Sequence, residues 1–287
     1  MESKTVSIKQ EEYPKLLKEI SKPPEELYFK GKLLPNESCF AIVGTRLCSN
    51  YGKQIALEIA GDLTLAGLTI VSGLAEGIDT FSHLAAVEKG KRTIAVLGTG
   101  LDEKSIYPRS NLGLSEKILK KGGCLISEYP HGTRGTKFTF PKRNRIISGL
   151  SLGVLVVEAK QRSGALITAK WARKQGKKVF AIPGPVHSLN SKGCHYLIKK
   201  GAILTENARD ILKQLKLPQK ATRPNSLENS TKEETLILEA LKQGPLYIDK
   251  IIEKTGLPTR SVASIISALE IKGKIRNLEG NTFSLSH

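Results

Sequence analysis

The sequence predicts a doubly wound, Rossmann-like α/β domain followed by a small winged-helix domain. Short, continuously apolar runs alternate with amphipathic segments from Cys39 to about Thr205. This alternation is typical of parallel strands that helices bury on both faces. Each of the first three apolar runs is followed by a glycine-containing loop, at the position where open parallel sheets bind ligands. After residue 212 the pattern is lost, and Pro, Asn and Ser become frequent.

The elements of the first domain follow from this alternation. Strands are expected at 39–43, 68–72, 93–97, 124–127, 153–159, 178–183 and 202–205. Helices are expected between them at 51–66, ending at Lys89, around 112–121 and at 165–175, with a further helix after Pro141. Residues 1–38 are interpreted as a leader with one short helix in EYPKLLKEI and a Pro- and Gly-punctuated connection after it. The Rossmann-like domain is therefore placed at 39–212.

The remainder of the chain is built differently. Residues 213–230 are interpreted as a linker because they are rich in Pro, Asn and Ser. Residues 231–287 contain three amphipathic runs and then a hairpin pattern with its turn at 279–281. Three helices followed by a β-hairpin are the parts of a winged helix-turn-helix.

The charge of the chain narrows the choice of partner. The 287 residues include 45 Lys and Arg against 27 Asp and Glu, which gives a formal net charge of +18. Such a surface attracts polyanions, of which nucleic acid is the first choice. An anionic membrane surface or simple solubility are the alternatives. The membrane alternative is weaker, because no basic amphipathic helix with a bulky aromatic face is evident.

Signals for export, membrane insertion or metal binding are absent from the sequence. The N-terminus lacks the apolar segment of a secretory signal, and no apolar run reaches the length of a membrane span. Cys39, Cys48, Cys124 and Cys194 show no paired spacing. We therefore expect a cytoplasmic protein without a disulfide framework, metal cluster or cofactor.

One stretch, Lys137–Ser151, combines rings and cations in a way that suits single strands. Its aromatics are interleaved with basic residues, as KFTFPKRNRIISGLS shows. Pro141 suits a first helical residue, and the apolar residues after it recur at helical spacing. A base can stack on a ring while a guanidinium contacts its phosphate. Alternatively, Phe138 and Phe140 are core residues and the charges form a solvated helix face.

The loops at the expected strand ends supply further candidates. GTR after the first strand offers backbone N–H groups and places Arg46 at the rim. Ser163 and Gly164 open a helix, whose unpaired N–H groups and dipole can hold a phosphate. Arg162 and Lys170 lie within about a turn of that position.

Familiar enzyme signatures are missing. The sequence has no GxxxxGK[ST], no GxGxxG after the first strand, no HExxH and no GxSxG. Asp79 and His83 share a helix face and suit either an acid/base pair or structural hydrogen bonding. Asp102, Glu128 and Glu158 stand at strand-end loops, where each is either catalytic or an orienting partner for an arginine. We expect no catalytic residues and no enzyme activity.

The sequence resembles the DprA (Smf) family of bacterial DNA-processing proteins. The matching motifs are AIVGTR..S.YG at 41–52, SGLAEGIDT..H at 72–83, AVLGTGLD....YP at 95–108, FPKRNRIISGLS at 140–151, VVEA...SGALITA at 156–169 and VFAIPG at 179–184. The resemblance covers about residues 13–211, and the FP.RNRIISGLS motif is specific to the family. Many members also carry a C-terminal unit of three helices and a wing.

The resemblance implies a DNA-handling protein. It implies binding of single-stranded DNA without sequence specificity in a basic pocket, formation of a homodimer, and loading of the RecA recombinase on incoming DNA during natural transformation (competence). The expected DNA-binding residues are Arg46, Lys137, Phe140, Arg143, Asn144, Arg145, Arg162, Ser163, Gly164 and Lys170. The expected phosphate-binding loops contain Gly44, Thr45, Ser72, Gly73 and Gly98.

Two departures from the family pattern limit what can be transferred. Many members begin with a helical SAM-like domain, for which the residues before Cys39 leave no room. His195 stands where the family usually has asparagine, so no polar contact is carried over to it.

Two other functions fit the sequence less well. A phosphoribohydrolase-like enzyme on the same fold needs a glutamate in a PGGxGTxxE loop, where this chain has Lys170 and Trp171. A transcriptional regulator needs a recognition helix dense in base-reading side chains, which the third C-terminal helix lacks.

Overall fold

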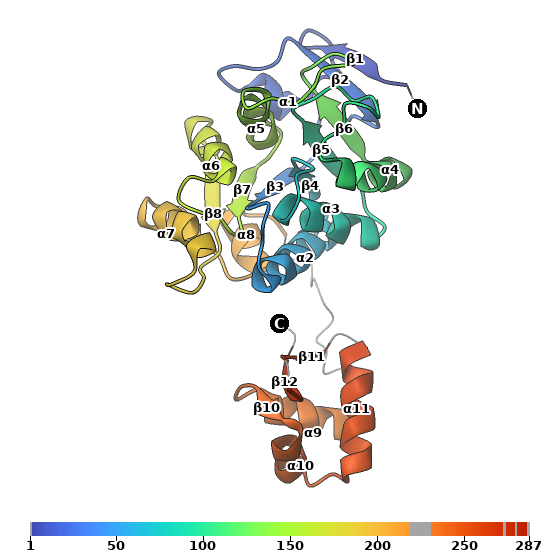
Figure 1. Ribbon diagram of the computed structural model, residues 1–287, viewed down its shortest axis with the longest axis vertical. Helices are drawn as coiled ribbons and strands as arrows, with labels where there is room; N and C mark the ends of the chain where they lie inside the picture. The colour runs from blue at the N-terminus through green and yellow to red at the C-terminus, as the bar shows by residue number, and fades with distance from the viewer. Residues whose placement is uncertain (1, 219–230, 272–273, 279, 286–287) are drawn as a thin grey trace. The chain divides into compact units, whose positions relative to one another are not determined.

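The computed structural model describes residues 2–218, 231–271, 274–278 and 280–285. The chain divides into two compact units, residues 1–222 and 223–287 (Figure 1). Each unit has a hydrophobic core of its own. Among the described residues, no helix has the length and apolar character needed to cross a membrane.

The first unit is built around one nine-stranded sheet with the order β1-β2-β6-β5-β4-β3-β7-β8-β9. The strands are β1 (Lys4–Ser7), β2 (Glu26–Gly31), β3 (Cys39–Val43), β4 (Thr69–Ser72), β5 (Thr93–Leu97), β6 (Cys124–Ser127), β7 (Gly153–Val156), β8 (Lys178–Ala181) and β9 (Ile203–Leu204). All pairs from β6 across to β9 are parallel. Only the β1–β2 and β2–β6 pairs are antiparallel within this sheet.

Helices cover both faces of the sheet. On one face lie α1 (Lys15–Lys18), α5 (Thr139–Gly149), α6 (Gly164–Lys174) and α7 (Lys192–Lys199). On the other lie α2 (Asn50–Leu65), α3 (Ile78–Glu88), α4 (Leu112–Lys120) and α8 (Ala208–Gln214). Ala41 and Val43 of β3 pack with the first set, whereas Phe40 and Ile42 pack with the second. This alternation confirms the predicted doubly wound fold, in which apolar side chains point to both faces of each strand.

The strand order reverses at β3. From β3 the sheet extends through β4, β5 and β6 to one side and through β7, β8 and β9 to the other. In open α/β sheets such a switch point leaves a crevice at the carboxyl ends of the two central strands. The loops after β3 and β7 flank this crevice.

The predicted connection in the N-terminal segment was wrong. Residues 1–38 contribute β1 and β2 to the edge of the sheet, where Tyr28 and Phe29 pair with Ser127 and Ile126 of β6. The two prolines before β2 lead into this strand and do not replace it, because Leu27 is fully buried within it. The N-terminal segment is thus part of the first unit.

Two smaller expectations also differ from the structure. Pro141 is the third residue of α5 and not the first, because the helix begins at Thr139. Proline remains tolerated there, since the first turn has no intrahelical use for its missing N–H. The expected linker overlaps α8 as far as Gln214, and its residues 219–230 lie outside the described part of the chain.

The second unit has the three helices and the wing of the predicted winged-helix domain. Its elements are α9 (Lys232–Leu241), β10 (Leu246–Tyr247), α10 (Ile248–Thr255), α11 (Thr259–Ile271), β11 (Ile275–Asn277) and β12 (Thr282–Leu285). β10 joins the hairpin as a third strand, which the sequence pattern had not indicated.

Candidate nucleic-acid interface

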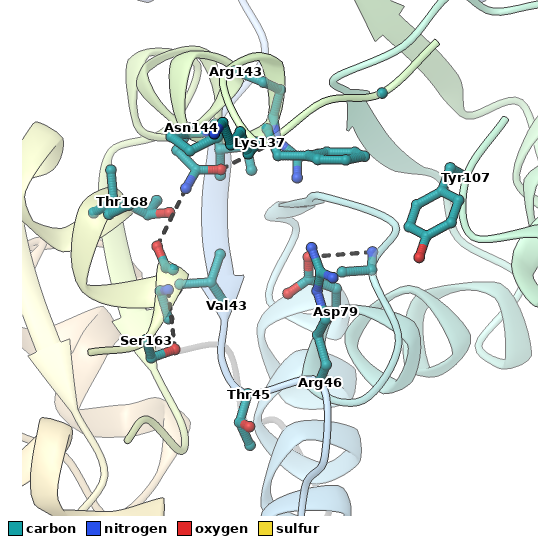
Figure 2. A pocket seen from close by; sticks show the side chains of 18 of the residues that line it. Val43, Thr45, Arg46, Asp79, Tyr107, Lys137, Arg143, Asn144, Ser163 and Thr168 are labelled. Carbon is teal, nitrogen blue, oxygen red and sulfur yellow. Dashed lines mark hydrogen bonds between the residues drawn. The ribbon is translucent and has the colours of Figure 1, made fainter. Parts of the chain in front are cut away.

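A cavity of about 1000 Å³ opens at the carboxyl ends of the central strands of the first unit (Figure 2). The loops after β3 and β7, the segment between β5 and α4, and the first turns of α5 and α6 line it. Its described lining includes the basic residues Arg46, Lys104, Arg109, Arg134, Lys137, Arg143, Lys160 and Arg162. Asp79 is the one carboxylate among them. The cavity therefore carries a strong excess of positive charge.

Arg143 lies at the base of this cavity and is almost fully buried. One of its guanidinium nitrogens, Nη1, donates to the carbonyl oxygens of Gly73, at 2.7 Å, and of Val96. Its Nε donates to Asn144 Oδ1 at 3.2 Å. Burial lowers the pKa of Arg143 to about 10, with the charge of Asp79 opposing this shift. The side chain remains a cation at neutral pH and is locked in place by its partners.

Asp79 and His83 do not form an acid/base pair. Asp79 Oδ2 accepts hydrogen bonds from the backbone N–H groups of Gly73, at 3.0 Å, and Ala75, at 3.4 Å. Burial raises the pKa of Asp79, while the nearby Arg143 charge lowers it. His83 Nδ1 lies 2.8 Å from Thr93 Oγ1, and burial lowers the pKa of His83 to about 3. Each residue has a structural partner of its own.

Phe140 lines the cavity in contact with a cation. The Arg46 guanidinium lies 5.8 Å from the centroid of the Phe140 ring, and the Tyr107 ring centroid lies 5.7 Å away. Gly98 and Gly135 approach the ring so closely that a Cβ would come within 2.8 Å and 2.3 Å, respectively, of ring carbons. Only glycine allows Phe140 this position. The ring is half-buried, whereas Phe138 is 73% exposed and does not line the cavity.

The N-terminus of α6 forms another wall of the cavity. Ser163 caps the helix, because its Oγ accepts from Ala165 N at 3.2 Å. Asn144 Nδ2 donates to Gly164 O at 3.2 Å and so joins α5 to α6. A capped helix start with its positive dipole end is favourable for an anion. Figure 2 shows Ser163 and Thr168 on the opposite side of the cavity from Tyr107.

The GTR loop after β3 is held from both sides. Thr45 N donates to Glu158 O at 2.8 Å, and Ile78 N donates to Thr45 O at 3.2 Å. The Glu158 carboxylate accepts from Ser49 N at 2.9 Å and from Ser49 Oγ at 2.6 Å, which fixes the start of α2. These contacts explain why Arg46 is presented to the cavity from a well-defined backbone.

The structure brings most of the expected site residues together. The lining contains Gly44, Thr45, Arg46, Lys137, Phe140, Arg143, Asn144, Arg162, Ser163 and Gly164. Ser72, Gly73, Gly98, Arg145 and Lys170 do not line it.

Arg145 is a correction to the expected site. Both of its terminal nitrogens bind the Glu128 carboxylate, and its Nε donates to Lys22 O at 3.0 Å. Two residues along a helix correspond to a rotation of about 200°, so Arg145 faces away from Arg143. Glu128 thus orients an arginine, as one of the two sequence interpretations held.

The other four residues also lie outside the cavity lining. Ser72 is fully buried and its Oγ donates to Ile42 O at 2.6 Å. Gly73 accepts from Arg143 and lines only a small adjoining cavity, while Gly98 lies behind Phe140. Lys170 is exposed, nearly two turns along α6 from its N-terminus. Ser72, Gly73 and Gly98 were expected in the site because small residues are typical of phosphate-binding loops. Closely packed positions need the same small residues.

Several lining residues were missed by the sequence analysis. They are Lys104, Tyr107, Arg109, Arg134, Lys160 and Thr168. Tyr107 stands in the Tyr–Pro pair of the third matching motif, so a signal for it was present. The lysines and arginines come from the segments that connect strands to helices, where residue type alone does not indicate which way a side chain points.

Two of the acidic candidates are structural as well. Asp102 accepts from Gly132 N at 2.7 Å and from Ser105 Oγ at 2.8 Å. Glu158 accepts from Ser49 Oγ at 2.6 Å. Within the described ranges, no group of three or more His, Cys, Asp or Glu side chains is arranged to hold a metal.

Each of the two units matches a known family model. The family model "DNA recombination-mediator protein A" matches residues 4–216, and the model "DprA winged helix domain" matches residues 221–281.

Individual relatives agree with these matches. Protein Smf of Escherichia coli is 39% identical over 279 residues, covering 93% of this chain and 74% of the relative. DNA processing protein DprA of Streptococcus pneumoniae is 47% identical over 201 residues, covering 70% of each.

Solved structures support the same assignment. The crystal structure of the S. pneumoniae protein aligns with a TM-score of 0.69 at 44% identity, covering 74% of each chain. DNA processing protein A from Helicobacter pylori, studied for its single-stranded DNA binding mode, aligns with a TM-score of 0.66 at 31% identity. That alignment covers 74% of this chain and 95% of the other.

Proposed function

Because this chain belongs to the DNA recombination-mediator protein A (DprA/Smf) family, we propose that it binds single-stranded DNA in the cavity of its first unit. The observation that carries the proposal is the combination of charge and ring in that cavity. Eight described Lys and Arg residues line it against one carboxylate, and Phe140 lies among them. Cations neutralise phosphates and a ring stacks a base, which together hold a strand without reading its sequence.

The cavity offers a path for a strand with a distinct chemistry at each side. Arg46 and Phe140 suit a nucleotide whose phosphate and base are bound together. The Ser163-capped start of α6, with Arg162 and Lys160, suits a further phosphate. These contacts are made with backbone and π-faces that every nucleotide shares, so little base preference is expected.

The first test is a fluorescence-anisotropy titration of labelled oligo-dT, and of a duplex of equal length, across a salt series. We expect strong preference for the single strand and a steep dependence of affinity on salt. Arg46→Glu should abolish most of this binding. Lys120→Glu, the same charge change on the exposed end of α4 outside the cavity, should not. Equal losses in both variants would show that the charged surface as a whole, and not the cavity, attracts DNA.

We further propose that the protein acts on DNA as a homodimer that helps to load RecA on incoming strands. The family assignment supports this role. The test is RecA assembly on oligo-dT already covered by a single-strand binding protein, with sedimentation velocity for the oligomeric state. Faster assembly in the presence of the protein is expected, and no effect at saturating protein would contradict the role in loading.

The same cavity gives little support to nucleotide hydrolysis. In the segment of α6 where a phosphoribohydrolase-like enzyme needs its glutamate, the chain has Lys170 and Trp171. Incubation with nucleoside 5′-monophosphates should therefore release no base. Release of base together with weak DNA binding would instead favour the phosphoribohydrolase-like function.

A further inference from the structure

Two aromatic rings meet at one end of the cavity, and the sequence had assigned a role to only one of them. Tyr107 and Phe140 have ring centroids 5.7 Å apart and planes inclined by 45°. Tyr107 is 51% exposed, whereas Phe140 is half-buried, with Gly98 and Gly135 pressed against its ring. The more accessible aromatic surface of the cavity therefore belongs to Tyr107.

The backbone that carries Tyr107 is well anchored. Asp102 accepts from Ser105 N at 3.1 Å and from Gly132 N at 2.7 Å, so one carboxylate ties this segment to the loop after β6. Ile106, the residue before Tyr107, is buried. Four residues after Tyr107, Asn111 Nδ2 donates to Leu74 O at 2.9 Å. A ring on an anchored backbone has less conformational entropy to lose when a ligand packs on it.

We propose that Tyr107 is a second base-stacking surface, which takes the base next to the one on Phe140. The inference rests on the proposed binding of single-stranded DNA and extends it. The two rings contact each other, so no base fits between them, and each ring would instead take one nucleotide. Arg46, 5.8 Å from the Phe140 centroid and in the lining of the same small adjoining cavity as Tyr107, is placed for the phosphate that joins the two nucleotides.

Position in the cavity, and not exposure alone, distinguishes Tyr107. Phe138 is more exposed, at 73%, and lies on the same segment as Phe140, yet it does not line the cavity. Its ring is covered in part by the ammonium group of Lys137, 5.2 Å from the centroid. Phe138→Ala is therefore the matched comparison for Tyr107→Ala.

The main experiment compares oligo-dT affinities of these variants by anisotropy. Tyr107→Ala should weaken binding roughly five- to hundredfold without changing the salt dependence, because a stacked base is lost and no phosphate contact is. Tyr107→Phe should bind within about twofold of the parent, as should Phe138→Ala. An oligonucleotide with abasic sites has phosphates but no bases, so it should not distinguish Tyr107→Ala from the parent protein. Equal thermal unfolding of the variants checks that the fold is intact.

A fluorescent probe reports the contact directly. The single Trp171 lies outside the cavity lining, so Trp171→Phe gives a silent background for Tyr107→Trp. Oligo-dT should quench the fluorescence of the Tyr107→Trp variant, and the abasic strand should not.

The outcomes separate this inference from the function on which it rests. If the parent protein does not bind oligo-dT, or binds without dependence on Arg46, the proposed function fails. If Arg46-dependent binding persists while Tyr107→Ala stays within twofold of the parent, or the Tyr107→Trp fluorescence is not quenched, only the second stacking surface is overturned. A loss in Tyr107→Phe equal to that in Tyr107→Ala would overturn it as well, since the hydroxyl would then be the binding group.

Discussion

Two buried arginines on opposite sides of α5 have different kinds of partner. Arg143 and Arg145 stand two residues apart and are each 5% exposed. Arg143 faces the cavity, and its hydrogen-bond partners are carbonyl oxygens, which carry no net charge. Arg145 faces the other way and is bound by the Glu128 carboxylate, which Lys142 also approaches at 3.3 Å. Arg143 has the Asp79 carboxylate as a nearby counter-charge, but the described cavity lining as a whole carries eight cations against that one carboxylate. The cavity side therefore keeps positive charge for a ligand, whereas the Glu128 side uses its charge to hold the fold.

The largest effect expected from this difference is on stability. Glu128→Ala leaves the Arg145 guanidinium buried without a carboxylate, which should cost about 3–5 kcal/mol of unfolding free energy. Urea unfolding measures this loss. Affinity for oligo-dT, taken where the variant is folded, should be unchanged. A double variant, Glu128→Leu with Arg145→Leu, should recover much of the stability, and a loss as large as in the single variant would argue against charge burial as the cause.

A pH-dependent effect comes from His83, which lies near the cavity-facing arginine. Burial, with the charge of Arg143 as a second cause, lowers the pKa of His83 to about 3. Below pH of about 6.5 the unfolded chain binds a proton at this residue that the folded chain does not, so stability falls as the pH falls toward 3.

The contribution of His83 amounts to about 2 kcal/mol between pH 7 and pH 5. It is measured as the difference between the pH dependence of urea unfolding in the parent protein and in His83→Gln. His187→Gln, on an exposed loop, should keep the dependence of the parent. An unchanged dependence in His83→Gln would mean that this histidine is not buried neutral.

On the cavity side, the expected effect is on binding. Phe140→Ala removes a stacking ring and should weaken binding to oligo-dT by about 1–3 kcal/mol, with the salt dependence unchanged. Lys142→Ala is the comparison from the same turn of the helix. Lys142 is paired with Glu128 on the other side, so its loss should change affinity little. If Lys142→Ala weakened binding more than Phe140→Ala, the division of α5 into two sides would be wrong.

The sequence could predict the parallel strands of the sheet because each of them carries its own signal. Runs such as CFAIV and TIAVL are apolar throughout, and this property decides burial on both faces without reference to distant residues. The strand β2 was missed since ELYFKG, beside two prolines, has one buried residue at Leu27 and lies next to the edge strand β1. Its place depends on pairing with β6, a partner far along the chain.

The candidate site was predictable only in part, for a related reason. Arg46 and Ser163 follow directly from strand ends and a helix start, positions that the topology fixes. Arg145 was misassigned since a basic cluster does not show which of its members meets a carboxylate such as Glu128. Gly98 was misassigned because a glycine needed for the close approach of Phe140 looks the same as one needed for a phosphate.

The smallest expected effect separates a cation inside the cavity from one just outside it. Arg46→Ala should reduce the slope of log affinity against log salt by about 0.7 on a single strand, since one phosphate contact is lost. Lys170 is exposed on α6 and does not line the cavity, so Lys170→Ala should leave this slope unchanged. Both variants remove one positive charge, and only their positions differ. Equal reductions in slope would extend the DNA path along α6, and the boundary of the cavity would then no longer be the boundary of the interface.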